Sequence, residues 1–147
     1  MPTDTPLPAG LLASLARSHG PRALVIRHSD RFSIGGGDPG FQTRLTPEGE
    51  RRAQALGAAL PDGLAWGVSS PLLRCLHTAQ LAGLDPTPTH VLGDPGPYVV
   101  RPDVGAAVWA HHGNPGVVRG LLRGETWGCM RSVADGAALI DTLLDQH

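Results

Sequence analysis

Two short apolar runs, each followed at once by polar residues and then by a helix signal, constrain the fold of this chain most strongly. The first run, Ala23–Ile26, is continuous and rich in β-branched residues, as in a strand buried on both faces of a parallel sheet. The run Leu64–Ser69 predicts a second strand. Two strand–helix units with short connections predict a three-layer α/β/α fold, in which right-handed crossovers join the strands of a mainly parallel sheet.

Helix signals follow both predicted strands. From Thr46 to Leu60 the chain offers a threonine N-cap, a proline at the first helical position, two glutamates in the first turn and apolar residues at helical spacing. From Ser70 to Ala82 a Ser-Pro cap precedes a second apolar face. Further signals predict a covering helix over Leu11–Ser18, a mobile loop at Gly35–Gly40 (GGGDPG), a third strand at Thr89–Leu92, a short helix from Asn114 to Leu122 and a last helix capped by Ser132.

Composition narrows the class of protein. With 147 residues, 41% of them hydrophobic, the chain can bury one core, so a single domain over residues 1–147 is expected. Twelve basic and 13 acidic side chains leave a net charge of -1, which provides no basic face for nucleic acid or a membrane. The chain does not begin with a leader pattern, and Cys75 and Cys129 lack the spacing of disulfides or metal sites. A cytoplasmic protein with small-molecule partners is expected.

The residues that can carry chemistry lie where the two predicted strands end. Arg27–Arg31 (RHSDR) follows the first strand, and Ser69–Arg74 (SSPLLR) ends the second. Ligands of parallel sheets gather at the carboxyl ends of the strands, so both segments are expected to face one crevice. A phosphoryl group needs donors around its oxygens, and the arginines of both segments supply them bidentately. A neutral imidazole can attack phosphorus without a metal ion, and His28 is placed to be that nucleophile.

Three segments resemble, in the family's order, the histidine phosphatase (phosphoglycerate mutase-like) superfamily. They are Ile26–His28 (IRH), Leu45–Gly49 (LTPEG) and Ser69–Arg74 (SSPLLR), the last followed by Thr78–Ala79. Family members typically have a strand ending in Arg-His-Gly, a Leu-Thr-x-x-Gly helix start, and Ser-Ser-Pro-x-x-Arg followed by Thr-Ala. The resemblance covers residues 23–82 and implies a phosphoglycerate mutase-like α/β fold.

The resemblance also implies roles for individual residues. His28 would accept the phosphoryl group, and Arg27 and Arg74 would bind the phosphate in the pocket. Arg31 resembles the second arginine of the acid-phosphatase branch and would be a third phosphate contact. No metal ion or other cofactor is implied. Ser29 departs from the family's glycine, and its side chain would narrow the pocket or change the turn, because glycine allows a closer backbone approach.

The family also uses a second histidine at the end of a later strand and a carboxylate that protonates the leaving group. In one interpretation Val108–Ala110 is that strand, and His112 is the second pocket histidine. In the other, this segment is a surface or helical insertion, and the strand would follow Leu144 in a longer chain, of which this one is a truncated form. The acid has three unranked candidates, Asp30, Asp94 and Glu125.

Other site types fit the spacing less well. His111 and His112 are adjacent, so they cannot easily chelate a metal ion together, and Gly35–Gly37 lacks the Gly-Lys-Ser/Thr of a nucleotide-binding loop. Two functions stay open. One is a metal-independent phosphomonoesterase that forms a phosphohistidine at His28 and acts on a small phosphorylated metabolite or a phosphopeptide. The other is a catalytically impaired phosphate-binding or scaffold protein of the same fold. The substrate and the oligomeric state do not follow from these residues.

Overall fold

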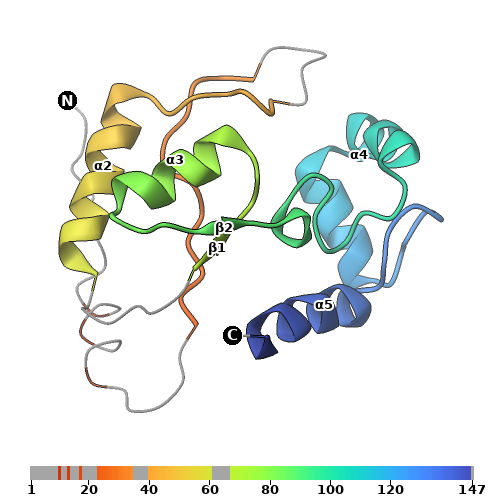
Figure 1. Ribbon diagram of the computed structural model, residues 1–147. Coiled ribbons are helices and arrows are strands. Elements are labelled where there is room, and N and C mark those ends of the chain that lie inside the picture. Colours follow the sequence, from red (N-terminus) through yellow and green to blue (C-terminus); the bar gives the residue numbers. More distant parts are fainter. Residues whose placement is uncertain are drawn as a thin grey trace. The chain divides into compact units, whose positions relative to one another are not determined.

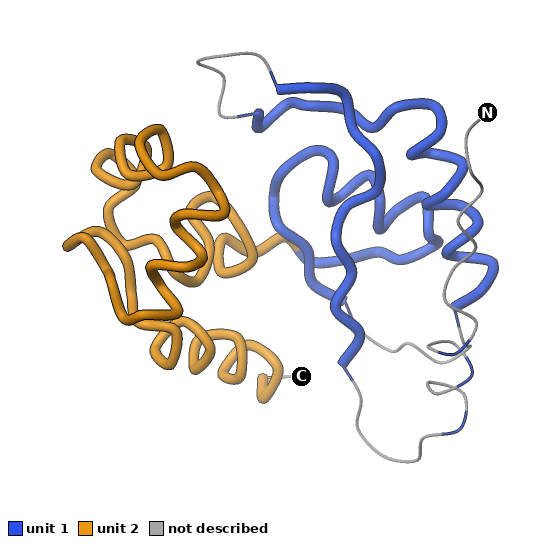
Figure 2. Tube along the Cα trace, turned by 180° about the vertical axis from the view of Figure 1, so that it is seen from behind, with its two compact units in different colours: residues 1–87 blue, residues 88–147 orange. Residues whose placement is uncertain are grey.

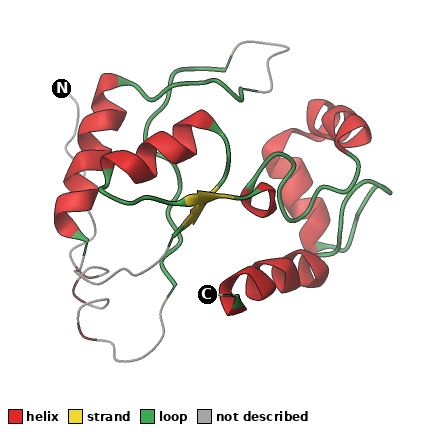
Figure 3. Cartoon of the chain, in the orientation of Figure 1, coloured by secondary structure: helices red, strands yellow, loops and turns green. Residues whose placement is uncertain are grey.

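The computed structural model describes residues 10, 13 and 17 and the ranges 23–34, 40–60 and 67–146. Over this part the structure is mixed α/β and mostly helical (Figure 1, Figure 3). The chain forms two compact units, a first unit of Met1–Thr87 and a second unit of Pro88–His147 (Figure 2). The elements are α2 (Pro47–Ala59), β1 (Val68–Ser69), α3 (Leu73–Leu81), β2 (Thr87–Pro88), the 3₁₀ helix η1 (His90–Leu92), α4 (Pro102–Leu122) and α5 (Val133–Asp145).

Helix α2 begins as its sequence predicts. The Thr46 hydroxyl accepts a hydrogen bond from the N–H of Gly49 at 3.0 Å, and Pro47 is the first helical residue. α2 packs against α3 (Figure 1). The backbones of the two helices come close at Gly57, where a Cβ atom would lie 2.6 Å from the carbonyl oxygen of Ala82. The predicted helix is therefore confirmed, and it rests on α3 through a position where only glycine fits without a shift.

The sheet of the first unit is small. β1 and β2 form a two-stranded parallel sheet, beside which the Thr87 N–H donates to the Gly67 carbonyl at 3.0 Å. The predicted strand Leu64–Ser69 is confirmed at β1, and residues 61–66 lie outside the described part. The predicted strand Ala23–Ile26 is wrong: these described residues form no strand, and Val25 is 90% exposed. An apolar run becomes a strand only where another segment pairs with its backbone, and that partner is not encoded locally.

The start of α3 also differs from its prediction. Ser70 does not cap the helix, because its hydroxyl accepts the N–H of Leu72 at 3.3 Å in the preceding turn. The helix therefore begins at Leu73. Two other predictions, the helix Leu11–Ser18 and the loop Gly35–Gly40, fall outside the described residues apart from residues 13, 17 and 40.

The second unit has an apolar core. Val117, Cys129 and Met130 are buried, and partly buried side chains pack around them: Val104, Val108, Trp109, Leu121 and Trp127. The predicted strand Val108–Ala110 is wrong, because this segment is helical and places Val108 and Trp109 on the core face of α4. Gly113, with a φ of 62°, kinks α4, and the predicted helix from Asn114 to Leu122 is confirmed as the part that follows the kink.

The ends of the second unit give one correction and one confirmation. The predicted strand Thr89–Leu92 is wrong, because the Thr89 hydroxyl accepts the N–H of Val91 at 3.3 Å and starts η1. The Ser132 cap is confirmed: its hydroxyl accepts the N–H of Asp135 at 3.1 Å and starts α5. Among the described residues no helix is long and apolar enough to cross a bilayer. The single domain and the three layers stay predictions.

Candidate active site around His28

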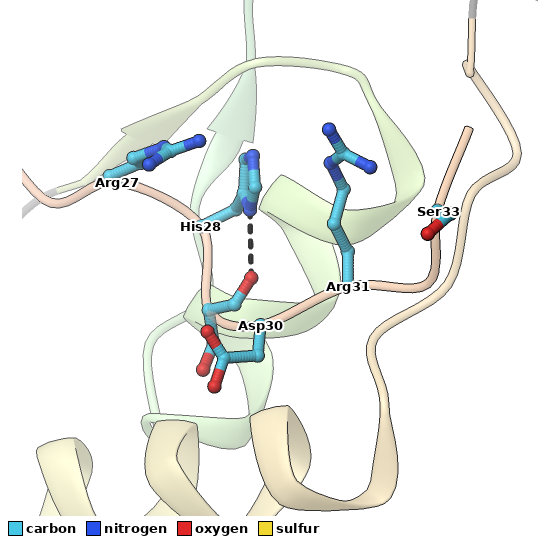
Figure 4. A pocket seen from close by; sticks show the side chains of 6 residues that line it. Arg27, His28, Asp30, Arg31 and Ser33 are labelled. Atoms are coloured by element: carbon cyan, nitrogen blue, oxygen red, sulfur yellow. Dashed lines mark hydrogen bonds between the residues drawn. The ribbon is translucent and has the colours of Figure 1, made fainter.

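The segment after Ile26 forms an open pocket of about 380 Å³. In Figure 4 the side chains of His28 and Arg31 rise on the same side of the chain, and the Arg27 guanidinium lies beside the imidazole. The Asp30 carboxylate points to the opposite side. The structure thus brings together three of the predicted site residues. The full lining is Arg27, His28, Ser29, Asp30, Arg31 and Ser33.

The half-buried imidazole of His28 is held in one orientation. Its Nδ1 atom lies 2.8 Å from the carbonyl oxygen of Ser29 (Figure 4). A carbonyl oxygen only accepts hydrogen bonds, so Nδ1 carries the proton in this contact. The lone pair of the neutral ring is then on Nε2, the nitrogen that is not bound to Ser29. The local backbone thereby selects the tautomer that has a nucleophilic Nε2.

The surroundings of His28 lower the pKa of its imidazole below 6.5. Burial is the largest cause, because it disfavours the charged ring. The hydrogen bond to Ser29 acts in the other direction, and the positive charges of Arg74, Arg27 and Arg31 lower the pKa further. His28 is therefore mostly neutral at pH 7, and three guanidinium groups are near enough to act on its charge.

Arg74 belongs to the first turn of α3 and is held by the segment that begins at Gly40. Its Nη1 donates to the carbonyl of Gly40 at 2.5 Å, and the adjacent Leu73 N–H donates to the Phe41 carbonyl at 3.2 Å. The Nε of Arg74 is buried and has no hydrogen-bond partner among the described residues. A buried donor without a partner is costly, and an anion bound beside it would satisfy it.

The backbone of the pocket segment pairs with the residues that precede α2. The Asp30 carbonyl accepts a hydrogen bond from the N–H of Thr46 at 3.0 Å, and the Phe32 N–H donates one to the backbone carbonyl of Arg44 at 3.1 Å. An antiparallel bridge joins Arg31 to Leu45, whose side chain is only 2% exposed. The LTPEG motif therefore supports the pocket as well as starting a helix.

The last residue of this motif, Gly49, lies against the backbone of the pocket segment. A Cβ atom at this position would overlap the carbonyl oxygen of Asp30. The first turn of α2 can lie against the pocket segment only because no side chain stands there. The sequence identified Gly49 as a motif residue, but nothing local indicated which backbone atom it faces.

Thr78 is the second supporting residue that the sequence singled out without a role. Its side chain is buried, and its hydroxyl accepts the Ser29 N–H at 3.0 Å and donates to the Arg74 carbonyl at 2.7 Å. It thus connects the turn that follows His28 with the helix that carries Arg74.

None of the three candidate acids is placed beside the His28 ring by a contact in the structure. Asp30 lines the pocket, but its Oδ2 lies 3.0 Å from Nη1 of Arg52 on α2. Asp94 and Glu125 belong to the second unit, where Glu125 pairs with Arg123 at 2.7 Å. The leaving-group acid stays a prediction.

His112 also belongs to the second unit. It lies on α4 just before the Gly113 kink, is exposed, and has its ring 4.6 Å from that of His111 and 5.4 Å from that of Trp127. The helical alternative for this segment is therefore confirmed, whereas a role of His112 in the phosphate pocket stays a prediction. Over the described ranges, no group of three histidine, cysteine, aspartate or glutamate side chains is arranged to hold a metal ion.

Comparison with known families agrees with this geometry. Residues 19–93 match the family model of the histidine phosphatase superfamily (branch 1), and this match spans half of the chain. The chain therefore belongs to the histidine phosphatase superfamily, which implies a phosphoglycerate mutase-like fold and phosphorylated ligands. The match includes His28, Arg74 and Thr78 and ends before α4. No curated protein and no solved structure gives a match.

Proposed function

We propose that this chain is a metal-independent phosphomonoesterase that forms a phosphohistidine at His28 and acts on a small phosphorylated metabolite or a phosphopeptide. Two properties of His28 support this proposal. Its Nδ1 is hydrogen-bonded to the Ser29 carbonyl, and its pKa is lowered by burial and by three arginines. An imidazole of this kind is neutral at pH 7 and keeps the Nε2 lone pair for attack. The family's three-layer fold is the finer architecture that we expect around it.

The reaction has two displacements at phosphorus. In the first, the Nε2 lone pair of His28 forms the P–N bond while the bond to the ester oxygen breaks, and the leaving oxygen takes a proton from an acid. In the second, water forms a new P–O bond, the P–N bond breaks, and the water proton returns to that acid. Arg27, Arg31 and Arg74 would stabilise the charge on the equatorial oxygens in both steps.

A second candidate function is a phosphate-binding or scaffold protein with weak catalysis. The observation that favours it is the ion pair between Asp30 and Arg52, which directs the one carboxylate of the pocket away from the His28 side. Without an acid the leaving oxygen departs unprotonated, which slows the first displacement. The anion site and its arginines would be unaffected.

The test is hydrolysis of an aryl phosphate by the full chain, with and without a chelator, beside His28→Ala. His90→Gln is the matched control, because its side chain is 72% exposed and lies in the second unit. Chelator-insensitive turnover that His28→Ala abolishes and His90→Gln retains supports the phosphatase. Rapid quenching with ³²P-labelled substrate should give an acid-labile, base-stable phosphoenzyme in the parent chain and in His90→Gln but not in His28→Ala. Turnover that survives His28→Ala would overturn the proposal.

Binding of inorganic phosphate separates the two candidate functions. Calorimetry should show phosphate binding that Arg74→Gln weakens, whether or not the chain turns over substrate. Binding together with turnover supports the enzyme, and binding without turnover or phosphoenzyme supports the phosphate-binding protein.

A further inference from the structure

The hydroxyl of Thr78 is the point where the two halves of the candidate pocket are joined. It lies in the middle of α3, at 4% exposure, and makes two hydrogen bonds of different origin. One is local, to the Arg74 carbonyl four residues earlier. The other crosses 49 positions of sequence to the N–H of Ser29, next to His28. Buried hydroxyls with two partners are specific orienting groups, because each bond has a preferred direction.

The direction of both bonds is fixed by chemistry. A backbone N–H only donates and a backbone carbonyl only accepts. The Thr78 hydroxyl must therefore give its proton to the Arg74 carbonyl and present a lone pair to Ser29. The resulting chain runs from the Ser29 N–H through the hydroxyl to the Arg74 carbonyl, so that each bond polarises the next.

The bond to Ser29 acts on the nucleophile through one residue, whose N–H and carbonyl belong to the two peptide groups on either side of its Cα atom. The residue whose N–H Thr78 holds is the same residue whose carbonyl accepts Nδ1 of His28 at 2.8 Å. A rotation of Ser29 would move that carbonyl and release the ring. The other hydrogen bond of the Thr78 hydroxyl holds the backbone carbonyl of Arg74, and the charge of the Arg74 side chain acts on His28.

We propose that Thr78 is a positioning residue, which holds the Ser29 turn so that His28 keeps its attacking orientation relative to the Arg74 segment. This inference deepens the proposed function and rests on it for the effect on turnover. An ordinary helix threonine also bonds to the carbonyl four residues earlier, and such a bond alone gives no role in a site. Thr142 on α5 has that bond to Ala138 at 2.8 Å but is exposed, so Thr142→Val is the matched control.

The test compares Thr78→Val, Thr78→Ser and Thr142→Val in the full chain. Valine keeps the shape and removes the hydroxyl, whereas serine keeps the hydroxyl. For Thr78→Val we expect kcat to fall by about 100-fold, as for other small misplacements of reacting groups, with KM changed less than about threefold. Thr78→Ser should restore kcat to within about threefold, and Thr142→Val should have no effect. Partial unfolding would also lower the apparent kcat without changing KM, so kcat is calculated per folded molecule, with the folded fraction taken from denaturant titration.

Two NMR measurements test the same proposal without turnover. In Thr78→Val the Ser29 amide should lose at least about tenfold of its hydrogen-exchange protection, since its hydrogen bond is gone. The ¹⁵N shifts of the His28 imidazole should also move, because the Nδ1 tautomer is no longer held. If the parent chain forms no phosphoenzyme, the proposed function fails, and these spectra alone decide the role of Thr78.

Loss of Ser29 protection with a changed His28 tautomer supports the positioning role. Unchanged spectra in a folded Thr78→Val chain overturn it, as does an unchanged kcat in an active enzyme. If Thr78→Val does not fold, Thr78→Cys replaces it, since a thiol is a weaker acceptor of similar size. A Cys variant equal to the Ser variant in kcat and in Ser29 protection would then overturn the role.

Discussion

The two units differ in what they bury. Among the described residues of the first unit, three polar side chains are buried, Ser69, Ser70 and Thr78, beside three apolar ones, Leu45, Ala53 and Ala82. In the second unit a continuous apolar cluster forms around Val117 and Cys129, with no buried polar side chain among the described residues. Hydrogen bonds fix direction, whereas apolar contacts fix proximity without direction. The buried hydrogen bonds of the first unit can therefore set the direction of side chains, whereas the apolar contacts of the second unit hold its helices together.

This contrast implies that substitutions in the first unit and in the second unit will change different measured quantities. Changes in the first unit should alter kcat, because they turn or remove groups of the pocket. Changes in the second should alter the free energy of unfolding and leave the turnover of the folded molecules unchanged. The following predictions test this division, beginning with the largest effect.

Replacing Arg74 by glutamine should affect catalysis most. The variant removes a charge that acts on His28 and would face the transferring phosphoryl group. We expect kcat to fall by about 100- to 1,000-fold, the usual cost of one donor to a developing charge. Arg119→Gln, at an exposed position of α4, is the control and should keep full activity. Equal rates for both variants would remove Arg74 from the site.

Gly49→Ala should combine a loss of stability with a loss of activity. The new Cβ would overlap the Asp30 carbonyl, a backbone atom that cannot rotate away. We expect a cost of about 1–3 kcal/mol in the free energy of unfolding and a kcat lower by up to about 100-fold, because the pocket segment shifts. Denaturant titration and kinetics on the folded fraction measure the two effects. Gly67→Ala, where a Cβ atom finds an ordinary contact with Pro86 at 3.8 Å, should change neither.

Gly120→Ala should lower stability alone. A Cβ atom there would overlap the indole of Trp127, which belongs to the packing around Val117. We expect about 1–3 kcal/mol of destabilisation from overpacking and an unchanged kcat for the folded molecules. Gly105→Ala on the same helix has its nearest contact at 3.6 Å and should be neutral or slightly stabilising. A reduced kcat in folded Gly120→Ala would contradict the division between the units.

The pH dependence should show the smallest effect. In the proposed reaction His28 attacks as the neutral ring, and its pKa is lowered from 6.5 by burial and by Arg74, Arg27 and Arg31. A lowered pKa means that the ring loses its proton at a lower pH, so kcat/KM should rise along an acid limb with its midpoint below pH 6.5. Arg74→Gln removes one lowering charge and should move the midpoint upward. NMR titration of the imidazole gives the same pKa independently, and a midpoint above 6.5 in the parent chain would refute the assignment.

Local sequence signals predicted helices well and strands poorly. The cap of α2 at Thr46 and the cap of α5 at Ser132 are hydrogen bonds between residues three positions apart, so the sequence contains both partners. The strand expected at Ala23–Ile26, and the strand that one of two interpretations placed at Val108–Ala110, needed partners elsewhere in the chain. The first is not paired among the described residues, and the second is part of α4. Apolar periodicity over so few residues does not separate a strand from one face of a helix.

The order of residues along the chain establishes which chemical groups can be concentrated at one point. Arg27, His28 and Arg31 lie within five consecutive residues, and all three line one pocket in the structure. Their order, with the motifs that follow, was also sufficient to indicate the family. These properties depend only on neighbours along the chain.

Tertiary packing sets how these groups are held. It brought Thr78 to the Ser29 amide, set Gly49 against the Asp30 carbonyl, and turned the Asp30 carboxylate toward Arg52. Each contact joins residues far apart in the sequence and depends on the packing of α2 and α3. Side-chain type states which bonds a residue can make, but the partner it finds is set by how the whole chain packs.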